Sequence, residues 1–425
     1  MNMNKIFFLL SSITYLQYYI PIIIELKLFN ISPIFLYRKN IKKYADPCSP
    51  INFKIIKEYC QIYNLDLINS NNFNFKNNIG IFFMIDGDIL GPSKEKYIKD
   101  SNLFKINSKS IKISLQENLN FVWNYESYIN YIDISIFPSK YYESTFKKFS
   151  KKNIFIGNTK YDIIKNQSEI FDKYKFNKKN KYVLFFFPKK KFQDYYNIKE
   201  NDIINIFNHL HKLNYKIIVK TRPKDYIFSD KLKGDIFINE EMLFPNISIT
   251  LLNLSDFCIL FSSSAVEETI KCKVPTIDFH VDLIDNLKRL NFLYHEKTIQ
   301  HVKNWKNINF DKFKTIHDKL VKKNDKLFNH IIDKYLFSGN ISKKILKYLF
   351  QNYKIKKIIN ISDLKSIFKI NINDFENYYF FIKEIYNLYL KRDPYSNEFY
   401  KHINDIKNNK FNEDNLIHYI KNLIH

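Results

Sequence analysis

The sequence predicts an α/β protein with two Rossmann-like, doubly wound domains and a C-terminal all-helical extension. Apolar runs of strand length alternate with amphipathic helical patterns through the first three quarters of the chain, and such alternation is typical of parallel sheets with helices on both faces. Gly157-Asn158-Thr159 separates two blocks of this kind, and after about residue 335 helical patterns rich in Lys, Tyr and Asn replace the strands. We therefore expect domains at 1–160 and 161–335, with the extension at 336–425.

Each expected strand is a short apolar run bounded by polar or turn-forming residues. In the first block these runs are Lys5–Leu10, Pro33–Tyr37, Leu65–Ile68, Ile79–Ile85, Ser110–Ser114, Ile132–Phe137 and Ile154–Ile156. In the second block they are Tyr182–Phe187, Lys216–Lys220, Asp235–Asn239, Phe257–Phe261 and Thr276–Phe279. Helical periodicity fills many of the gaps, for example at Asn52–Tyr63, Ser139–Phe149, Ile198–Leu213 and Ser264–Cys272.

The first apolar run, Ile6–Ile24, is nearly uncharged and about long enough to span a bilayer. It contains Ser11-Ser12, Thr14, Gln17 and Pro21, and polar groups at that density are costly in lipid. We therefore expect a βαβ opening, in which a strand and a Ser-Ser turn lead into a helix from about Thr14 to Phe29. No small-residue cleavage site follows, which disfavours a signal peptide.

The composition indicates a globular protein with phosphate-bearing or anionic partners. Apolar residues make up 45% of the 425 residues, and the formal net charge is +24. The lysines are scattered and do not form a basic module interleaved with aromatic residues, so we expect no nucleic-acid partner. The four cysteines (Cys48, Cys60, Cys258 and Cys272) form no CxxC pair. They predict reduced, buried thiols in a cytoplasmic protein, with no metal site.

The most informative stretch runs from the strand Phe257–Phe261 through Ser262, Ser263 and Ser264 into a helix that carries Glu267 and Glu268. A serine turn at a helix N-terminus presents free backbone N–H groups, which bind phosphate. Capping alone is the other interpretation, with Ser264 as the N-cap residue and Glu267 as its partner in a capping box. We favour phosphate binding, because one serine and one glutamate would suffice for a cap.

Cationic residues follow two other strands of the second block. Lys189 lies in the loop after Tyr182–Phe187, where a solvated loop is an equally good interpretation, and Arg222 follows Lys216–Lys220. The carboxyl ends of parallel strands meet at one edge of a sheet. Arginine is scarce in this chain and suits bidentate phosphate binding. We therefore expect these side chains to converge with the serine turn on a diphosphate.

Three segments in this order resemble motifs of the GT-B glycosyltransferases, in the branch shared with non-hydrolysing UDP-N-acetylglucosamine 2-epimerases and CDP-glycerol glycerophosphotransferases. Residues 156–162 (IGNTKYD) resemble the link that opens the second domain, 219–224 (VKTRPK) resemble a strand end, and 261–268 (FSSSAVEE) resemble the nucleotide-diphosphate motif. The resemblance implies that Ser262, Ser263 and Ser264 contact the phosphates and that Glu268 holds the ribose. The glycines of the family motif are Ser263 and Ser264 here, and its leading Asp is Phe261.

The same resemblance implies a metal-independent transferase without a cofactor, which uses a nucleotide-diphosphate sugar as donor. The acceptor would be a cell-surface polysaccharide or a lipid-linked saccharide. If transfer inverts the anomeric centre, a base must deprotonate the acceptor hydroxyl. The first histidine is His209, so a base in the first domain must be a carboxylate. Glu117 is our preferred candidate, with Asp86 and Asp88 as alternatives that also fit a turn around Gly87. Asp133, at the start of a strand, is expected to be structural.

Three other functions stay open at this stage. A CDP-glycerol-type glycerophosphotransferase and a nucleotide-sugar 2-epimerase fit the same fold, and a non-catalytic nucleotide-sugar-binding scaffold fits the loss of the motif glycines. The net charge also favours peripheral association with the anionic inner face of the cytoplasmic membrane. Residues 375–425, around Arg392-Asp393-Pro394, resemble the DUF4214 module, and an ordinary helical hairpin is the alternative.

Overall fold

The computed structural model describes most of both predicted α/β domains and part of the C-terminal region. The described residues are 5–27, 31–39, 45–85, 105–116, 131–140, 143, 150–162, 172–188, 190–195, 197–221, 227, 229–239, 247–261, 263, 265–279, 297–322, 325–337 and 339–353, followed by 382, 385–386, 389–390, 394, 398, 401–402, 405–406, 410 and 412–422.

The N-terminal domain contains a sheet of seven parallel strands in the order β3-β2-β1-β4-β5-β6-β7. The chain enters at the middle of the sheet and adds strands first on one side and then on the other, which is the doubly wound arrangement. Helix α1 (Leu16–Lys27) covers one face, and α2 (Pro50–Ile62) connects β2 to β3. The strands are β1 (Ile6–Leu10), β2 (Ile34–Tyr37), β3 (Asp66–Asn69), β4 (Ile81–Ile85), β5 (Ile111–Leu115), β6 (Ile134–Phe137) and β7 (Lys152–Phe155).

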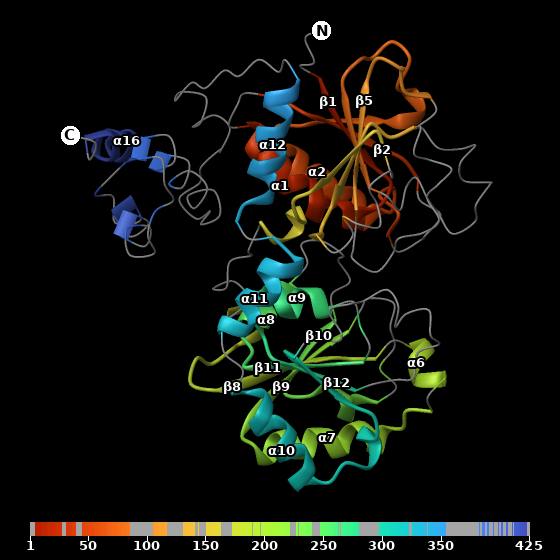
Figure 1. The fold of residues 1–425 in the computed structure, drawn as a ribbon, viewed down its shortest axis with the longest axis vertical. Helices are drawn as coiled ribbons and strands as arrows, with labels where there is room; N and C mark the ends of the chain where they lie inside the picture. The colour runs from red at the N-terminus through yellow and green to blue at the C-terminus, as the bar shows by residue number, and fades with distance from the viewer. Residues whose placement is uncertain are drawn as a thin grey trace.

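The second domain repeats this plan with six parallel strands in the order β10-β9-β8-β11-β12-β13. Figure 1 shows it in green to cyan, with α7 and α10 on one face of the sheet and α8, α9 and α11 on the other. Its strands are β8 (Lys181–Phe186), β9 (Tyr215–Thr221), β10 (Ile236–Asn239), β11 (Phe257–Leu260), β12 (Thr276–Phe279) and β13 (Ile299–Val302). Its helices are α6 (Lys190–Tyr195), α7 (Glu200–Lys212), α8 (Ser248–Asn253), α9 (Val266–Lys271), α10 (Phe310–Leu320) and α11 (Asp325–Tyr335).

The two-domain α/β prediction is confirmed, and all the expected strands are present. One edge strand, β13, was not predicted. Its two end residues, Ile299 and Val302, are buried, and the two between them, Gln300 and His301, are half-buried. Such a strand is too short and too polar to form an apolar run. The expected helix Ser139–Phe149 lies mostly outside the described residues.

The predicted βαβ opening is also confirmed. Strand β1 is buried along its whole length, and α1 leads from its turn toward β2. Among the described residues, no helix is long and apolar enough to cross a membrane. The apolar run at the N-terminus is therefore explained by burial, since α1 lies between the sheet and a second layer of protein.

That second layer is α12 (Ile341–Asn352), which follows the second domain in the sequence but packs on the first. Ile341, Ile345, Leu346 and Leu349 join the core formed by α1 and the first sheet. Figure 1 shows α12 in blue beside α1, above the second domain. The chain therefore passes between the two domains twice.

The C-terminal part has a small core of its own, which includes Ile382, Ile385, Tyr386 and residues of α16 (Glu413–Asn422). Its helical character is as expected.

The cysteines correct one expectation. Cys60 and Cys258 are buried free thiols, and burial raises the pKa of Cys60 to about 12. Cys48, in contrast, is exposed, because it lies in the turn before α2 rather than in a strand or helix core. The prediction of a buried thiol was wrong at this position.

Candidate functional site

The described residues contain only part of the predicted site. Ser263, Glu267 and Glu268 are described. The other predicted donor contacts and the base candidates lie outside the described residues: Lys189, Arg222, Ser262, Ser264, Asp86, Asp88 and Glu117. The described strands that precede the base candidates show from which edge of the sheet those segments begin. Strands β4 and β5 pair side by side and end level, at Ile85 opposite Leu115. Asp86 is the next residue after β4, and Glu117 comes two residues after β5.

The serine turn connects β11 to α9, at the carboxyl edge of the second sheet. The Ser263 hydroxyl accepts a hydrogen bond from the backbone N–H of Ala265 (3.3 Å), and the Ser263 carbonyl accepts one from Val266 (3.3 Å). Ser263 therefore closes the turn within the chain.

The predicted capping box is wrong. Helix α9 begins at Val266, its N-cap residue is Ala265, and no side chain caps it. With this start, Glu267 occupies the second helical position and not the third, so it does not reach back to the N-cap backbone. Its carboxylate is instead directed to residues that follow the first domain.

Those residues are Lys160 and Tyr161, in the link between the domains. The Lys160 ammonium lies 3.6 Å from Glu268 Oε1 and 3.8 Å from Glu267 Oε2. All three side chains are largely buried, with exposed fractions of 9% for Lys160, 13% for Glu268 and 4% for Glu267. One lysine thus holds both glutamates of the predicted nucleotide motif. We refer to Lys160, Tyr161, Glu267, Glu268 and Lys271 as the junction cluster.

Tyr161 completes the centre of the junction cluster. The Lys160 ammonium lies 4.8 Å from the centroid of its ring, and the Lys271 ammonium lies 5.4 Å from it. The Tyr161 hydroxyl and Glu267 Oε1 are both buried, and neither makes a hydrogen bond of good geometry within the described structure. They approach each other closely enough for each to influence the other's ionisation, but fall short of that geometry.

Burial dominates the electrostatics of this cluster. It raises the pKa of Glu267 despite the opposing effect of Lys160, and it raises the pKa of Tyr161 well above the usual range. Burial also lowers the pKa of Lys271, an effect that Glu267 and Asp162 partly offset. Charged groups in a poorly hydrated site interact strongly with any ligand charge. Lys160 is paired with both glutamates, and the Lys271 ammonium donates to the Phe337 carbonyl, so the cations for a bound diphosphate would have to come from other side chains.

The link itself is fixed at both ends. The Thr159 hydroxyl donates to the Tyr18 carbonyl in α1 (2.7 Å). Asp162 accepts hydrogen bonds from the backbone N–H groups of Ile341 (3.0 Å) and Ser342 (2.7 Å), and thereby caps α12. Gly157 has φ +118°, and a Cβ atom there would lie 2.6 Å from Ile341 Cδ1. The segment resembling the family link is therefore the structural joint of the molecule.

Sequence reasoning missed the role of Lys160 and Tyr161. Both lie in the segment 156–162, which the sequence marked only as a domain link. The available signal was a lysine in one segment and two adjacent glutamates in the other, which carry opposite charges. No local pattern shows that these two segments meet.

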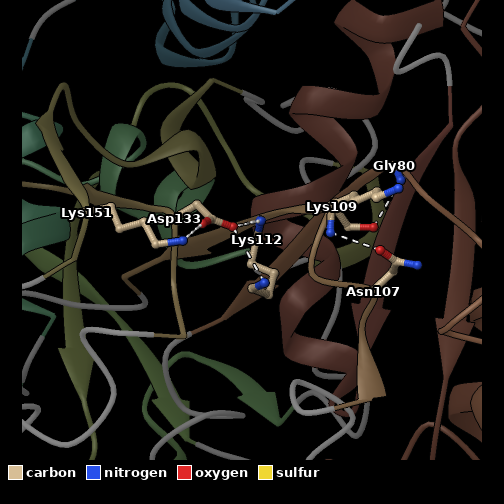
Figure 2. A network of polar contacts seen from close by, with 7 residues as sticks. Gly80, Asn107, Lys109, Lys112, Asp133 and Lys151 are labelled. Carbon is tan, nitrogen blue, oxygen red and sulfur yellow. Dashed lines mark hydrogen bonds and ion pairs between the residues drawn. The ribbon is translucent and has the colours of Figure 1, made fainter. Parts of the chain in front are cut away.

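The opposite, amino-terminal edge of the first sheet behaves as expected. Asp133 Oδ2 accepts a hydrogen bond from the Lys112 backbone N–H (2.9 Å), and Oδ1 pairs with the Lys151 ammonium (2.6 Å). Figure 2 shows this network, with Gly80, Asn107 and Lys109 engaged nearby. The prediction that Asp133 is structural agrees with this geometry.

No protein-family model matches the sequence, and no curated protein matches it either. Solved structures do match the fold. The glycotransferase of kitacinnamycin is 8% identical, with a TM-score of 0.52 over 82% of this chain and 98% of that one. The wall teichoic acid polymerase TagF is 15% identical, with a TM-score of 0.53 over 83% and 89% of the two chains. The UDP-GlcNAc 2-epimerase from Methanocaldococcus jannaschii is 13% identical, with a TM-score of 0.51 over 82% and 100%.

These similarities concern the fold alone, because the sequence identities are low throughout. They do not extend support to the DUF4214 resemblance of the C-terminal residues, which stays a prediction. With its two parallel, doubly wound sheets and a helix that returns to the first domain, the chain has a two-domain, Rossmann-like fold of the GT-B type.

Proposed function

We propose that this chain is a glycosyltransferase that moves a sugar from a nucleotide-diphosphate donor to a cell-surface polysaccharide or lipid-linked acceptor. The observation that carries the proposal is the position of Glu267 and Glu268. They follow the serine turn at the carboxyl edge of the second sheet, in the first turn of α9, in a GT-B fold. In open α/β sheets, ligands bind at this edge.

In this proposal each predicted residue has a separate task. Glu268 accepts the ribose hydroxyls, while Ser262, Ser263 and Ser264 offer backbone N–H groups to the diphosphate. Arg222 and Lys189 supply positive charge, which stabilises the leaving diphosphate as the bond to the sugar breaks. Glu117, or otherwise Asp86 or Asp88, removes the proton from the attacking acceptor hydroxyl. Lys160 and Lys271 are already engaged within the protein, so the proposal assigns the diphosphate to Arg222 and Lys189.

The fold neighbours leave two related activities as alternatives. TagF is named as a polymerase of wall teichoic acid, and the archaeal neighbour as a 2-epimerase. Transfer of a glycerol phosphate unit would use the same donor edge with a CDP-linked donor. Epimerisation would need no acceptor. The additional helical part after residue 353 favours a transferase.

The test is a nucleotide panel followed by a turnover assay. We expect UDP, CDP or their sugar or glycerol conjugates to raise the melting temperature of the purified protein, and the matching nucleosides to do so less. The stabilising conjugate is then supplied with saccharide or lipid-linked acceptors, and release of the nucleotide is measured. Absence of a shift with every nucleotide would reject the enzyme and leave at most a scaffold with another ligand.

We also propose that the protein attaches peripherally to the anionic inner face of the cytoplasmic membrane. The net charge of +24 supports this, since each lysine near such a surface contributes about 1 kcal/mol and the attraction is screened by salt. Binding to vesicles that contain an anionic lipid should fall steeply as salt is added, and neutral vesicles should not bind. Retention on the membrane after a wash with high salt at alkaline pH would contradict peripheral attachment.

A further inference from the structure

Most of the buried polar side chains without a hydrogen-bond partner in the described part of the first domain lie just past the carboxyl ends of its strands. Among the described residues up to the domain link, four buried polar side chains have no hydrogen-bond partner: Ser11, Ser70, Gln116 and Ser135. Ser11 directly follows β1, Ser70 follows β3, and Gln116 follows β5. Ser135 lies within β6. The amino edge is the opposite case, since Asp133 and the Ser110 hydroxyl there are both bonded.

Gln116 and Ser135 lie on the same face of the sheet. In β5, Ile113 and Leu115 belong to the core shared with α1 and α12, so alternation places Ser114 and Gln116 on the other face. Ser135 is paired in register with Ser114, and the Gln116 backbone N–H continues the ladder by donating to Ile136. Ser135 and Gln116 are therefore diagonal neighbours, with Cα atoms about 8 Å apart given ordinary strand spacing and rise.

Neither atom of the Gln116 carboxamide is used, although both are buried. Gln116 exposes 6% of its surface, and Ser11 and Ser135 expose 3% each. A buried polar group without a partner costs stability, and natural proteins keep few of them. Ser11 and Gln116 lie just past the carboxyl ends of β1 and β5, and Ser135 lies one strand further, near the start of β6. A ligand at this part of the sheet would supply the partners that these groups lack. Ser11 and Gln116 also flank β4 in the sheet, and β4 is the strand that precedes Asp86.

We propose that Ser11, Gln116 and Ser135 form an acceptor subsite that binds the hydroxyl groups of a neutral sugar or polyol. Serine hydroxyls and a carboxamide both donate and accept hydrogen bonds, as do the hydroxyls of a sugar. None of the three carries a charge, whereas a phosphate group would call for cations. This inference rests on the proposed function, because it names the acceptor class for the predicted base.

The test uses substitutions whose effects on stability and on binding have opposite signs. Gln116→Met keeps an unbranched side chain of similar length and removes both unused polar atoms. Without ligand, its melting temperature should equal or exceed that of the wild type, because no hydrogen bond is lost. Its affinity for the acceptor should fall roughly tenfold, and that of Ser11→Ala roughly threefold. A role in core packing alone would move stability and leave binding unchanged.

Calorimetric titration is carried out on the full chain with methyl glycosides of glucose, galactose and N-acetylglucosamine, and with glycerol. Octyl glycosides of the same sugars distinguish a lipid-linked source from a free saccharide. The matched control is Thr250→Val in α8 of the second domain, another fully buried hydroxyl without a partner in the described structure. It should bind the glycosides as the wild type does.

Weaker glycoside binding by Gln116→Met and Ser11→Ala, with stability maintained, supports the subsite. The inference is overturned if the wild type binds none of these neutral probes, if it binds only glycerol phosphate, or if Gln116→Met binds as well as the wild type. Titration with UDP and CDP is run in parallel on every variant. Loss of nucleotide binding in the wild type would reject the proposed donor function, while the glycoside titration would still decide on the subsite.

Discussion

Two carboxylates of this molecule, Asp133 and Glu267, each lie close to lysine side chains but differ in how fully they are satisfied. Asp133, at the amino edge of the first sheet, accepts a backbone N–H and pairs with two lysines, one of them 63% exposed. Glu267, in the junction cluster, is buried, lies 3.8 Å from a single lysine ammonium, and has one oxygen unpaired within the described structure. The first arrangement holds strands together. In the second, the other carboxylate oxygen lies near the Tyr161 hydroxyl, without a cation or a backbone N–H of its own.

The largest expected effect comes from removing Lys160. Lys160→Met would leave two buried carboxylates without their cation, and breaking a buried pair from one side should lower the free energy of unfolding by about 3 kcal/mol. The control, Lys151→Met, removes an exposed partner of Asp133 and should cost less than about 1 kcal/mol. Chemical denaturation of both variants measures the difference. Equal losses would erase the distinction between the two carboxylates.

Glu268 and Glu267 should separate binding from stability. Glu268→Ala should weaken nucleotide binding by roughly 1.5–3 kcal/mol, the range for hydrogen bonds to a charged group. Glu267→Ala should lower stability and change nucleotide affinity less, because its carboxylate faces Lys160 and Tyr161. Arg222→Ala should lose affinity for UDP or CDP more than for the nucleosides. Calorimetric titration of the three variants decides, and wild-type affinity in Glu268→Ala would remove its ribose role.

The raised pKa of Glu267 predicts a pH dependence of stability. Burial raises this pKa above the ordinary value of 4.5, so the folded chain holds the proton more tightly than the unfolded chain does. The contribution of this proton to the free energy of unfolding is fully present below pH 4.5. It is lost as the pH rises through the pKa of Glu267 in the folded chain. Each unit of difference is worth about 1.4 kcal/mol. Relative to Glu267→Gln, the wild type should therefore lose stability as the pH rises across this window. A parallel pair of pH profiles would contradict the burial argument.

The smallest effect is expected at the amino edge. Asp133→Asn keeps an oxygen for the Lys112 backbone N–H and loses only charge, so stability should change by less than about 1 kcal/mol. Added salt should reduce the difference further, because Lys151 is exposed. Thermal unfolding at low and high salt measures it. A loss as large as that of Lys160→Met would place Asp133 among the essential buried charges.

The fold could be predicted from the sequence because most strands contain a short apolar run, which is recognised without information from distant parts of the chain. β11, for example, is read directly from Phe257-Cys-Ile-Leu, and it ends where the serines begin. β13 could not be read in this way, since only its two end residues are apolar. The site was predicted less well for a related reason. The sequence suggested that Glu267 takes part in a local capping box. In the structure its carboxylate lies 3.8 Å from the ammonium of Lys160, which comes from a distant segment. Contacts between segments far apart in the chain decide burial, and burial is the main cause of the pKa shifts of Glu267, Tyr161 and Lys271.

The return of α12 to the first domain has a mechanical consequence. The polypeptide joins the domains twice, at Gly157–Asp162 and again near Phe337, and Gly157 lies in contact with both Phe337 and Ile341. Two adjacent tethers define an axis, so the domains are expected to open and close like the leaves of a book, with little twisting or sliding. Ser11 and Gln116 belong to the first domain, and Glu268 belongs to the second. The joint would keep these residues aligned while the distance between the two domains changes.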